Sequence, residues 1–296
     1  MQQSRWLNWM IEQSSLRNAE SLIRFGAEKL SSISNVPRLE AEVLLSNLLK
    51  INPIKFHTDE IGISSNVMDK FESMIESRFK GMPIAYLIGK KEFWSLEFEI
   101  NPSVLVPRPE TELLIENAIE LLKDHESARI LELGTGSGVV SIVLYKELVT
   151  PQITATDISD EALYVAKNNA DRYQIKDINF LVSDWFSEIQ KKKYELIISN
   201  PPYVDKTKHS NEERFGIDME PDIALYSENN GTSDLEFIIQ NSSIFLKHGG
   251  CLMLEHGYDQ ADYCMREMKK AGYSRIKKSK DIQNIPRTIS GTFLNE

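Results

Sequence analysis

From about residue 111 onward, the sequence alternates short apolar runs with longer segments of helical periodicity. The runs of strand length are Arg129–Leu133, Ile153–Thr156, Ile178–Val182, Tyr194–Ser199, Cys251–Glu255 and 287–294. The helical segments are 111–123, 138–147, 159–170, 232–246 and 259–271. Strands separated by helices predict an α/β fold whose mostly parallel sheet is covered on both faces. Ligands bind such sheets beyond the carboxyl ends of the strands, so functional residues are expected there.

The N-terminal part of the sequence has a different pattern. Pro37 is placed to begin a helix with an apolar stripe, and a second helix is expected to start near Asn66 as its cap. No strand-like alternation occurs before residue 84. Several prolines then interrupt a hairpin-like segment. The predicted domains are a small all-helical domain at 1–83, a hairpin and linker at 84–110, and an α/β domain at 111–296.

Charge is distributed unevenly along the chain. The formal net charge is −10, yet residues 1–80 carry equal numbers of basic and acidic side chains, so the excess negative charge lies in the remainder. Proteins that grip a phosphate backbone usually show the opposite balance. The distribution therefore argues against duplex DNA as the substrate and predicts no direct contact with nucleic acid.

Composition also bounds the compartment and the chemistry. The two cysteines, Cys251 and Cys264, suggest a reducing compartment and are expected to be core residues. The five histidines show no metal-ligand spacing, so no metal site is expected. There is no apolar run of the ~18 residues that a membrane span needs and no signal-peptide pattern. We therefore expect a cytoplasmic protein, and we expect it to be a monomer.

A glycine loop follows the first predicted strand, in the order Gly134-Thr135-Gly136-Ser137-Gly138. Such a loop allows a tight turn and lets a ligand approach bare backbone. A dinucleotide fingerprint would need a third glycine at Val139, and a phosphate loop would need a Lys-Ser or Lys-Thr end. The loop could be no more than a tight turn. If it binds a ligand, its lack of basic residues favours a ligand without phosphates, such as S-adenosylmethionine.

Two further strand ends carry residues suited to the same ligand. Asp157 ends the second strand and could accept hydrogen bonds from both ribose hydroxyls. Asp184 follows the third strand and could accept from the adenine amino group, while Trp185 could flank the ring. Alternatively, Asp157 could be an ordinary loop residue and Trp185 could simply pack in the core. After a glycine loop at this distance, a cofactor site is the stronger prediction.

The fourth strand runs into Asn200-Pro201-Pro202-Tyr203. Two prolines stiffen this loop and leave carbonyl groups free to accept hydrogen bonds. Asn200 adds a side-chain acceptor, and Tyr203 adds a flat apolar face. Together they fit a planar NH2 group, whose two protons would be held by acceptors so that its lone pair faces a methyl donor. Orientation and electrostatics would then supply the rate enhancement without a strong base.

The glycine loop together with Asn200–Tyr203 resembles class I methyltransferases that act on planar nitrogens. Four other stretches narrow the resemblance to the release factor glutamine methyltransferases: 92–95 (EFWS), 106–112 (VPRPETE), 183–186 (SDWF) and 254–257 (LEHG). That resemblance covers nearly the whole chain. It implies a seven-stranded Rossmann-like methyltransferase domain behind a helical domain, and methylation of the glutamine in the Gly-Gly-Gln motif of class I release factors.

The resemblance also assigns roles to residues. It implies that Gly134–Gly138, Asp157, Trp185 and Asn200 contact the cofactor, that Arg108–Thr111 closes over its methionine part, and that Asn200–Tyr203 holds the glutamine. Glu255 and His256 are expected to make structural hydrogen bonds. Two other functions remain open: methylation of an exocyclic amine in DNA or RNA, which acidity disfavours, and a non-catalytic binding protein, which the intact motifs disfavour.

Overall fold

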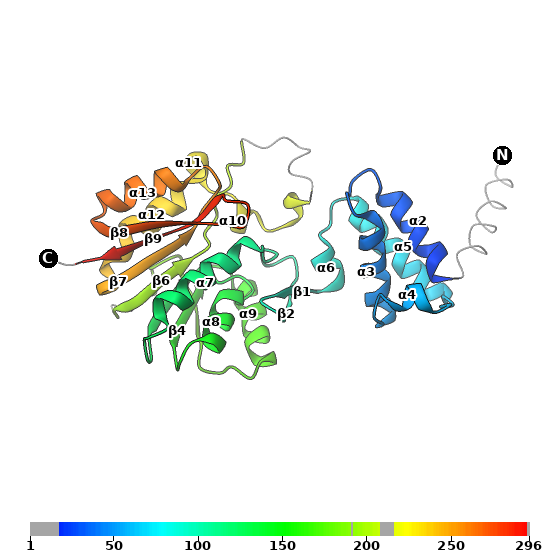
Figure 1. Cartoon of the computed structure of the whole chain (residues 1–296), viewed down its shortest axis with the longest axis horizontal. Helices are drawn as coiled ribbons and strands as arrows, with labels where there is room; N and C mark the ends of the chain where they lie inside the picture. The colour runs from blue at the N-terminus through cyan, green and yellow to red at the C-terminus, as the bar shows by residue number, and fades with distance from the viewer. Residues whose placement is uncertain (1–17, 191, 208–215, 295–296) are drawn as a thin grey trace. The chain divides into compact units, whose positions relative to one another are not determined.

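The computed structural model describes residues 18–190, 192–207 and 216–294 (Figure 1). They form two compact units. The first comprises residues up to Gly89 together with 216–219, and the second comprises the rest. Within the described residues, no helix is long and apolar enough to cross a membrane.

The first unit is helical, as predicted. Its helices are α2 (Ala19–Leu30), α3 (Pro37–Leu49), α4 (Lys55–Thr58), α5 (Ser65–Phe79) and α6 (Ile84–Ile88). Apolar side chains such as Leu22, Leu44 and Phe71 form its core. α5 begins at Ser65, so the expectation that Asn66 caps this helix is wrong. The short helix α6 extends the compact unit to Gly89, beyond the expected end at residue 83.

A hairpin opens the second unit. β1 (Lys90–Phe93) pairs antiparallel with β2 (Leu96–Glu99) across Trp94 and Ser95, which both have positive φ as a tight hairpin turn requires. The Asn169 side chain accepts from the Glu99 backbone N–H at 2.7 Å and donates to the Ser137 carbonyl at 2.9 Å. The hairpin is therefore fastened to the glycine loop through one buried amide.

The main sheet has seven strands, as the family resemblance implies, and six of them correspond to the predicted apolar runs. They are β3 (Arg129–Leu133), β4 (Gln152–Asp157), β5 (Asn179–Val182), β6 (Tyr194–Ser199), β7 (Leu246–Glu255), β8 (Tyr273–Lys280) and β9 (Pro286–Phe293). Their order is β5-β4-β3-β6-β7-β9-β8. β9 runs antiparallel to both β7 and β8, whereas the pairs among β3 to β7 are parallel, so the sheet is mostly parallel.

Helices cover both faces of this sheet (Figure 1). On one side lie α7 (Glu110–Leu122), α8 (Val139–Glu147) and α9 (Asp160–Arg172); on the other lie α12 (Ser233–Asn241) and α13 (Ala261–Lys270). The expected helix 232–246 ends earlier, since Ser242–Ile244 is a 3-10 turn and β7 already begins at Leu246. The short helices α10 (Asp222–Leu225) and α11 (Glu228–Gly231) precede α12.

The strand order reverses beside β3. The chain runs outward from β3 through β4 to β5 and then returns to place β6 on the other side of β3. Such a switch point opens a crevice at the carboxyl ends of the strands. The glycine loop and Asn200 follow the two strands that flank this crevice.

Candidate active site

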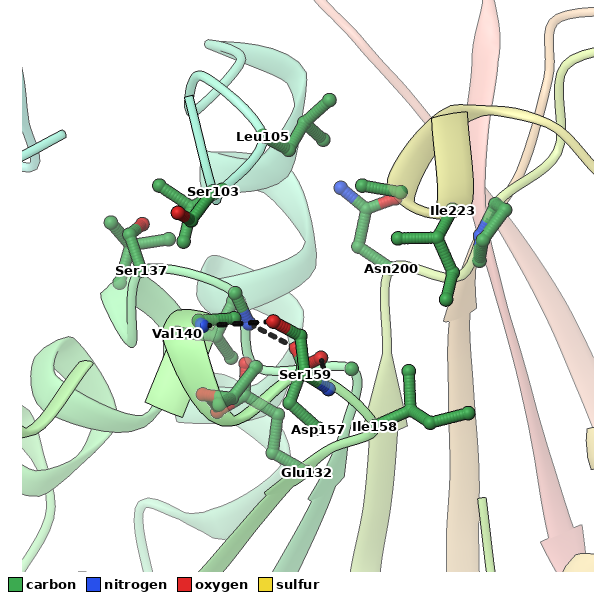
Figure 2. A pocket seen from close by; sticks show the side chains of 18 of the residues that line it. Ser103, Leu105, Glu132, Ser137, Val140, Asp157, Ile158, Ser159, Asn200 and Ile223 are labelled. Carbon is green, nitrogen blue, oxygen red and sulfur yellow. Dashed lines mark hydrogen bonds between the residues drawn. The ribbon is translucent and has the colours of Figure 1, made fainter. Parts of the chain in front are cut away.

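A cavity of about 320 Å³ lies at these strand ends (Figure 2). Its size falls within the range of small-molecule sites. The predicted site residues that line it are Arg108, Thr111, Gly134, Thr135, Gly136, Ser137, Asp157, Asp184, Trp185, Asn200 and Pro202. The fold thus brings residues almost a hundred positions apart in the sequence around one cavity.

Three predicted site residues do not line the cavity. Gly138 has a φ of 83° just before α8, and a Cβ there would lie 3.1 Å from the Cβ of Ala166, so glycine is needed for helix packing. Pro201 is buried. Tyr203 is partly buried, and its hydroxyl donates to Glu255 Oε1 at 3.0 Å.

Glu132, which was not predicted as a site residue, fixes the glycine loop to the start of α8. Its buried carboxylate accepts from the Thr135 hydroxyl at 2.8 Å, from the Ser141 backbone N–H at 3.1 Å and from the Ser141 hydroxyl. Burial raises the pKa of Glu132 to about 7 against the lowering effect of these bonds. The sequence does contain a sign of this role, because an acidic residue between two leucines in an apolar strand needs hydrogen-bond partners when it is buried.

Asp157 joins two parts of the site at the end of β4. Its Oδ2 accepts from the Gly136 backbone N–H at 2.8 Å, and its Oδ1 accepts from the Ser159 N–H at 3.0 Å (Figure 2). Burial raises the pKa of Asp157, and these backbone donors oppose that rise. Each carboxylate oxygen has further lone pairs, so the group is fixed in position and can still accept from a ligand.

Asp184 and Trp185 lie where β5 ends. The Trp185 backbone has a φ of 46°, a conformation that bulky residues seldom adopt. The Ser183 hydroxyl stabilises this turn by donating to the Trp185 carbonyl at 2.9 Å. The Trp185 ring comes within 3.8 Å of the position that a Cβ on Gly134 would take. An aromatic face therefore stands beside the glycine loop, where a planar heterocycle could stack.

Arg108 is engaged by a partner that sequence reasoning did not identify. Its guanidinium pairs with Glu220, whose side chain is buried. The same carboxylate accepts from the Val106 backbone N–H at 2.9 Å. Glu220 thus fastens the proline-rich segment that leads into α7, and Arg108 helps to fix this wall of the cavity.

The opposite wall comes from the segment around α10. Ile223, Ala224 and Tyr226 line the cavity, and Figure 2 shows Ile223 beside Asn200, across from Ser137 and Asp157. Ile158 and Leu105 add apolar surface. No local sequence signal marked α10 as part of the site, because only the tertiary fold brings it there.

The lining fits S-adenosylmethionine. Among the described residues that line the cavity, Arg108 is the one cation, and it is paired with Glu220, whereas Glu132, Asp157, Asp184 and Asp234 are acidic. A ligand with phosphates would meet these carboxylates with unfavourable charge. A sulfonium ligand with a ribose and an adenine finds acceptors and an aromatic face.

Comparisons with known proteins agree with this geometry. Residues 109–215 match the family model described as the methyltransferase small domain, and residues 21–89 match the PrmC N-terminal domain. A release factor glutamine methyltransferase from Coxiella burnetii is 39% identical over 89% of this chain and 94% of that protein. One from Shewanella oneidensis is 34% identical over 96% of this chain and 98% of that protein.

A solved structure shares the fold at low sequence identity. A methyltransferase from Pyrococcus furiosus has a TM-score of 0.51 and 17% identity, covering 78% of this chain and all of that chain. Its likeness supports the arrangement of the sheet and helices.

Proposed function

The chain belongs to the release factor glutamine methyltransferase family, and we propose that it transfers a methyl group from S-adenosylmethionine to the side-chain amide nitrogen of a glutamine. The acceptor is the glutamine of the Gly-Gly-Gln motif in class I release factors. The observation that carries this proposal is the convergence of the glycine loop and the Asn200–Pro202 loop on one cavity.

The residues at three strand ends would hold the cofactor. Asp157 would accept from the ribose hydroxyls, Asp184 from the adenine amino group, and the Trp185 face would cover the ring. The bound cofactor supplies an electrophilic methyl carbon on a positively charged sulfur. Acidic side chains around the cavity favour that positive charge.

The Asn200–Tyr203 loop would hold the substrate amide. The Asn200 side-chain oxygen and the Pro201 carbonyl would each accept one of the two amide protons. An amide lone pair is delocalised, and holding both protons in this way directs the pair toward the methyl carbon. The cofactor would supply the methyl group and leave as the neutral thioether, and the amide nitrogen would lose one of its two protons to solvent as it gains that group. Orientation of this kind can lower the barrier by several kcal/mol, roughly 7 or more in well-aligned cases.

We further propose that the helical unit, residues 18–89, contributes to docking of the release factor. We propose that the enzyme acts as a monomer. Because release factors act in translation, we place the enzyme in the cytoplasm.

Transfer of labelled methyl groups tests the proposed function. The full chain would be incubated with labelled S-adenosylmethionine and, separately, a class I release factor, its Gly-Gly-Glu variant, duplex DNA and RNA. Labelling of the release factor alone is expected, because a carboxylate in place of the amide would face two acceptor oxygens without compensation. Strong labelling of DNA, RNA or the glutamate variant would contradict the proposal.

A further inference from the structure

Glu255 is a buried carboxylate at the carboxyl end of β7, with 1% of its surface exposed. Both of its oxygens accept from hydroxyl groups. Thr111 Oγ1 lies 2.7 Å from Oε2, and Tyr203 Oη lies 3.0 Å from Oε1. Glu255 thereby connects the first turn of α7 with the last residue of the Asn200–Tyr203 loop.

The first residue of that loop joins the same network. Asn200 Nδ2 lies 3.2 Å from Thr111 Oγ1. A threonine hydroxyl has a single hydrogen, and here it is donated to Glu255, so the Thr111 oxygen can only accept from Asn200. The amide nitrogen of Asn200 must therefore face Thr111. Its oxygen, Oδ1, remains as the acceptor that the side chain presents.

Without an acceptor at Glu255 this orientation would not be enforced. The Thr111 hydroxyl could instead donate to the Asn200 oxygen, and the Asn200 amide would turn over. It would then present NH2 to the NH2 of a substrate amide, and two donors cannot satisfy each other.

We propose that Glu255 is a positioning residue for methyl transfer, which orients the Asn200 amide through Thr111 and anchors the Tyr203 ring directly. This proposal rests on the proposed function, because the oriented oxygen is the acceptor for the substrate amide. Glu255 itself does not line the cavity.

Acting as a double acceptor requires the ionised carboxylate. Burial raises the pKa of Glu255 to about 7, and the hydrogen bonds from Thr111 and Tyr203 oppose this rise. Glu110 on α7 raises the pKa further, whereas Arg287 on β9 lowers it. The neighbouring His256 is buried, which lowers the pKa of its imidazole and favours the neutral ring. Protonation would turn one Glu255 oxygen into a donor. Either the Thr111 hydroxyl or the Tyr203 hydroxyl would then lose its acceptor and could turn toward another partner.

The test is the turnover of Glu255→Gln at saturating cofactor and pH 8. A glutamine keeps the shape but can accept through only one of its two terminal atoms. We expect kcat to fall about tenfold or more, as misorientation of a reacting group typically costs. Glu267→Gln, a change at another buried carboxylate that pairs with Lys270 on α13, should leave kcat within about twofold.

Two variants at Thr111 show whether Glu255 acts through that hydroxyl. Thr111→Ser keeps the hydroxyl and should retain turnover within about threefold, whereas Thr111→Val removes it and should lose about as much as Glu255→Gln. The double variant Glu255→Gln/Thr111→Val should be hardly slower than either single variant, because both break one network. The Thr111 pair is informative even if Glu255→Gln fails to fold.

The pH dependence of kcat adds a further test, because a purely structural role of Glu255 would leave that dependence unchanged. The kcat of the wild-type enzyme should decline as the pH falls through about 7, and this limb should be absent in Glu255→Gln. Wild-type turnover in Glu255→Gln, or equal turnover in Thr111→Ser and Thr111→Val, would overturn the proposal. Labelling of the release factor by the wild-type enzyme is scored separately, so failure of the proposed function is distinguishable from failure of this inference.

Discussion

A Cβ atom on Gly231 would lie 2.3 Å from the carbonyl oxygen of Tyr203. The two residues are drawn together by Gln260, whose Nε2 donates to both carbonyl groups at 3.0 Å. Gly231 ends α11, and its φ of 80° follows two asparagines that also have positive φ. The end of the Asn200–Tyr203 loop is thus shaped by close backbone contact with a segment nearly thirty residues away.

Gly231→Ala should lower both stability and methyl transfer, because the methyl group would push the Tyr203 backbone from its place. Gly249→Ala is the matched control: its φ is 79°, yet nothing lies within 4 Å of its Cβ position. Strain at positive φ costs roughly 1 kcal/mol in both, whereas only Gly231→Ala adds about 1–3 kcal/mol of overpacking. Calorimetric melting and kcat measurements check this. Equal melting temperatures and rates in the two variants would contradict it.

Asp157→Ala should weaken cofactor binding about a hundredfold or more. Two hydrogen bonds to a charged acceptor would be lost, each contributing about 1.5–3 kcal/mol net. Isothermal titration with S-adenosylmethionine gives the dissociation constant. Asp160→Ala, which removes an exposed carboxylate three residues on, is the control and should bind normally. An unchanged affinity in Asp157→Ala would place the ribose elsewhere.

The cofactor-free protein should lose stability as the pH rises from about 4.5 to 7. Burial raises the pKa of both Glu132 and Glu255 from 4.5 to about 7, so the folded state binds more protons than the unfolded state in this window. The free energy of unfolding then falls with rising pH, by roughly 1–3 kcal/mol for each carboxyl group. The stabilising contribution is fully lost above about pH 7.

Urea denaturation at pH 5 and pH 8 measures this change. Asp281, whose pKa is lowered, acts at lower pH, whereas buried His256 has a lowered pKa that acts in this window with the opposite sign and offsets part of the fall. Glu132→Gln should flatten the dependence by removing one of the two carboxyl groups. An equal difference in stability between pH 5 and pH 8 in the wild-type protein and in Glu132→Gln would contradict the prediction.

Residues 90–296 alone should bind S-adenosylmethionine with the affinity of the full chain. Every residue that lines the cavity lies in this part, and its core is separate from the core of the helical unit. Methylation of an intact release factor should fall sharply in this fragment, whereas slow methylation of a short Gly-Gly-Gln peptide should be unchanged. Full activity of the fragment on the intact factor would refute a docking role for the helical unit.

The sequence predicted the elements that have a strong apolar period and missed those without one. β8 was not expected, because its residues are mostly polar, with three lysines after Ile276, and it lies at the edge of the sheet. Edge strands tolerate charged residues on exposed positions, so the alternation that marks a strand is weak. The turn before β9 is formed by Asp281, which accepts from two backbone N–H groups, and by Asn284 at positive φ.

Sequence motifs located cavity-lining residues that directly follow strands, but not those that only the tertiary fold brings to the cavity. Gly136, Asp157 and Asn200 were found because the carboxyl ends of parallel strands meet at one edge. Ile223 and Glu220 were missed, since nothing local ties them to that edge. Glu255 was predicted to make structural hydrogen bonds, and it does so with Thr111 and Tyr203.

The most direct measurement is the position of the methyl group on the product. A class I release factor would be incubated with the full chain and S-adenosylmethionine, digested, and its peptides fragmented in a mass spectrometer. We expect the mass of one methyl group on the glutamine side chain of the Gly-Gly-Gln motif, and none in an otherwise identical reaction with Asn200→Ala. A methyl group on another residue, or an unmodified glutamine after prolonged incubation with excess enzyme, would contradict the account.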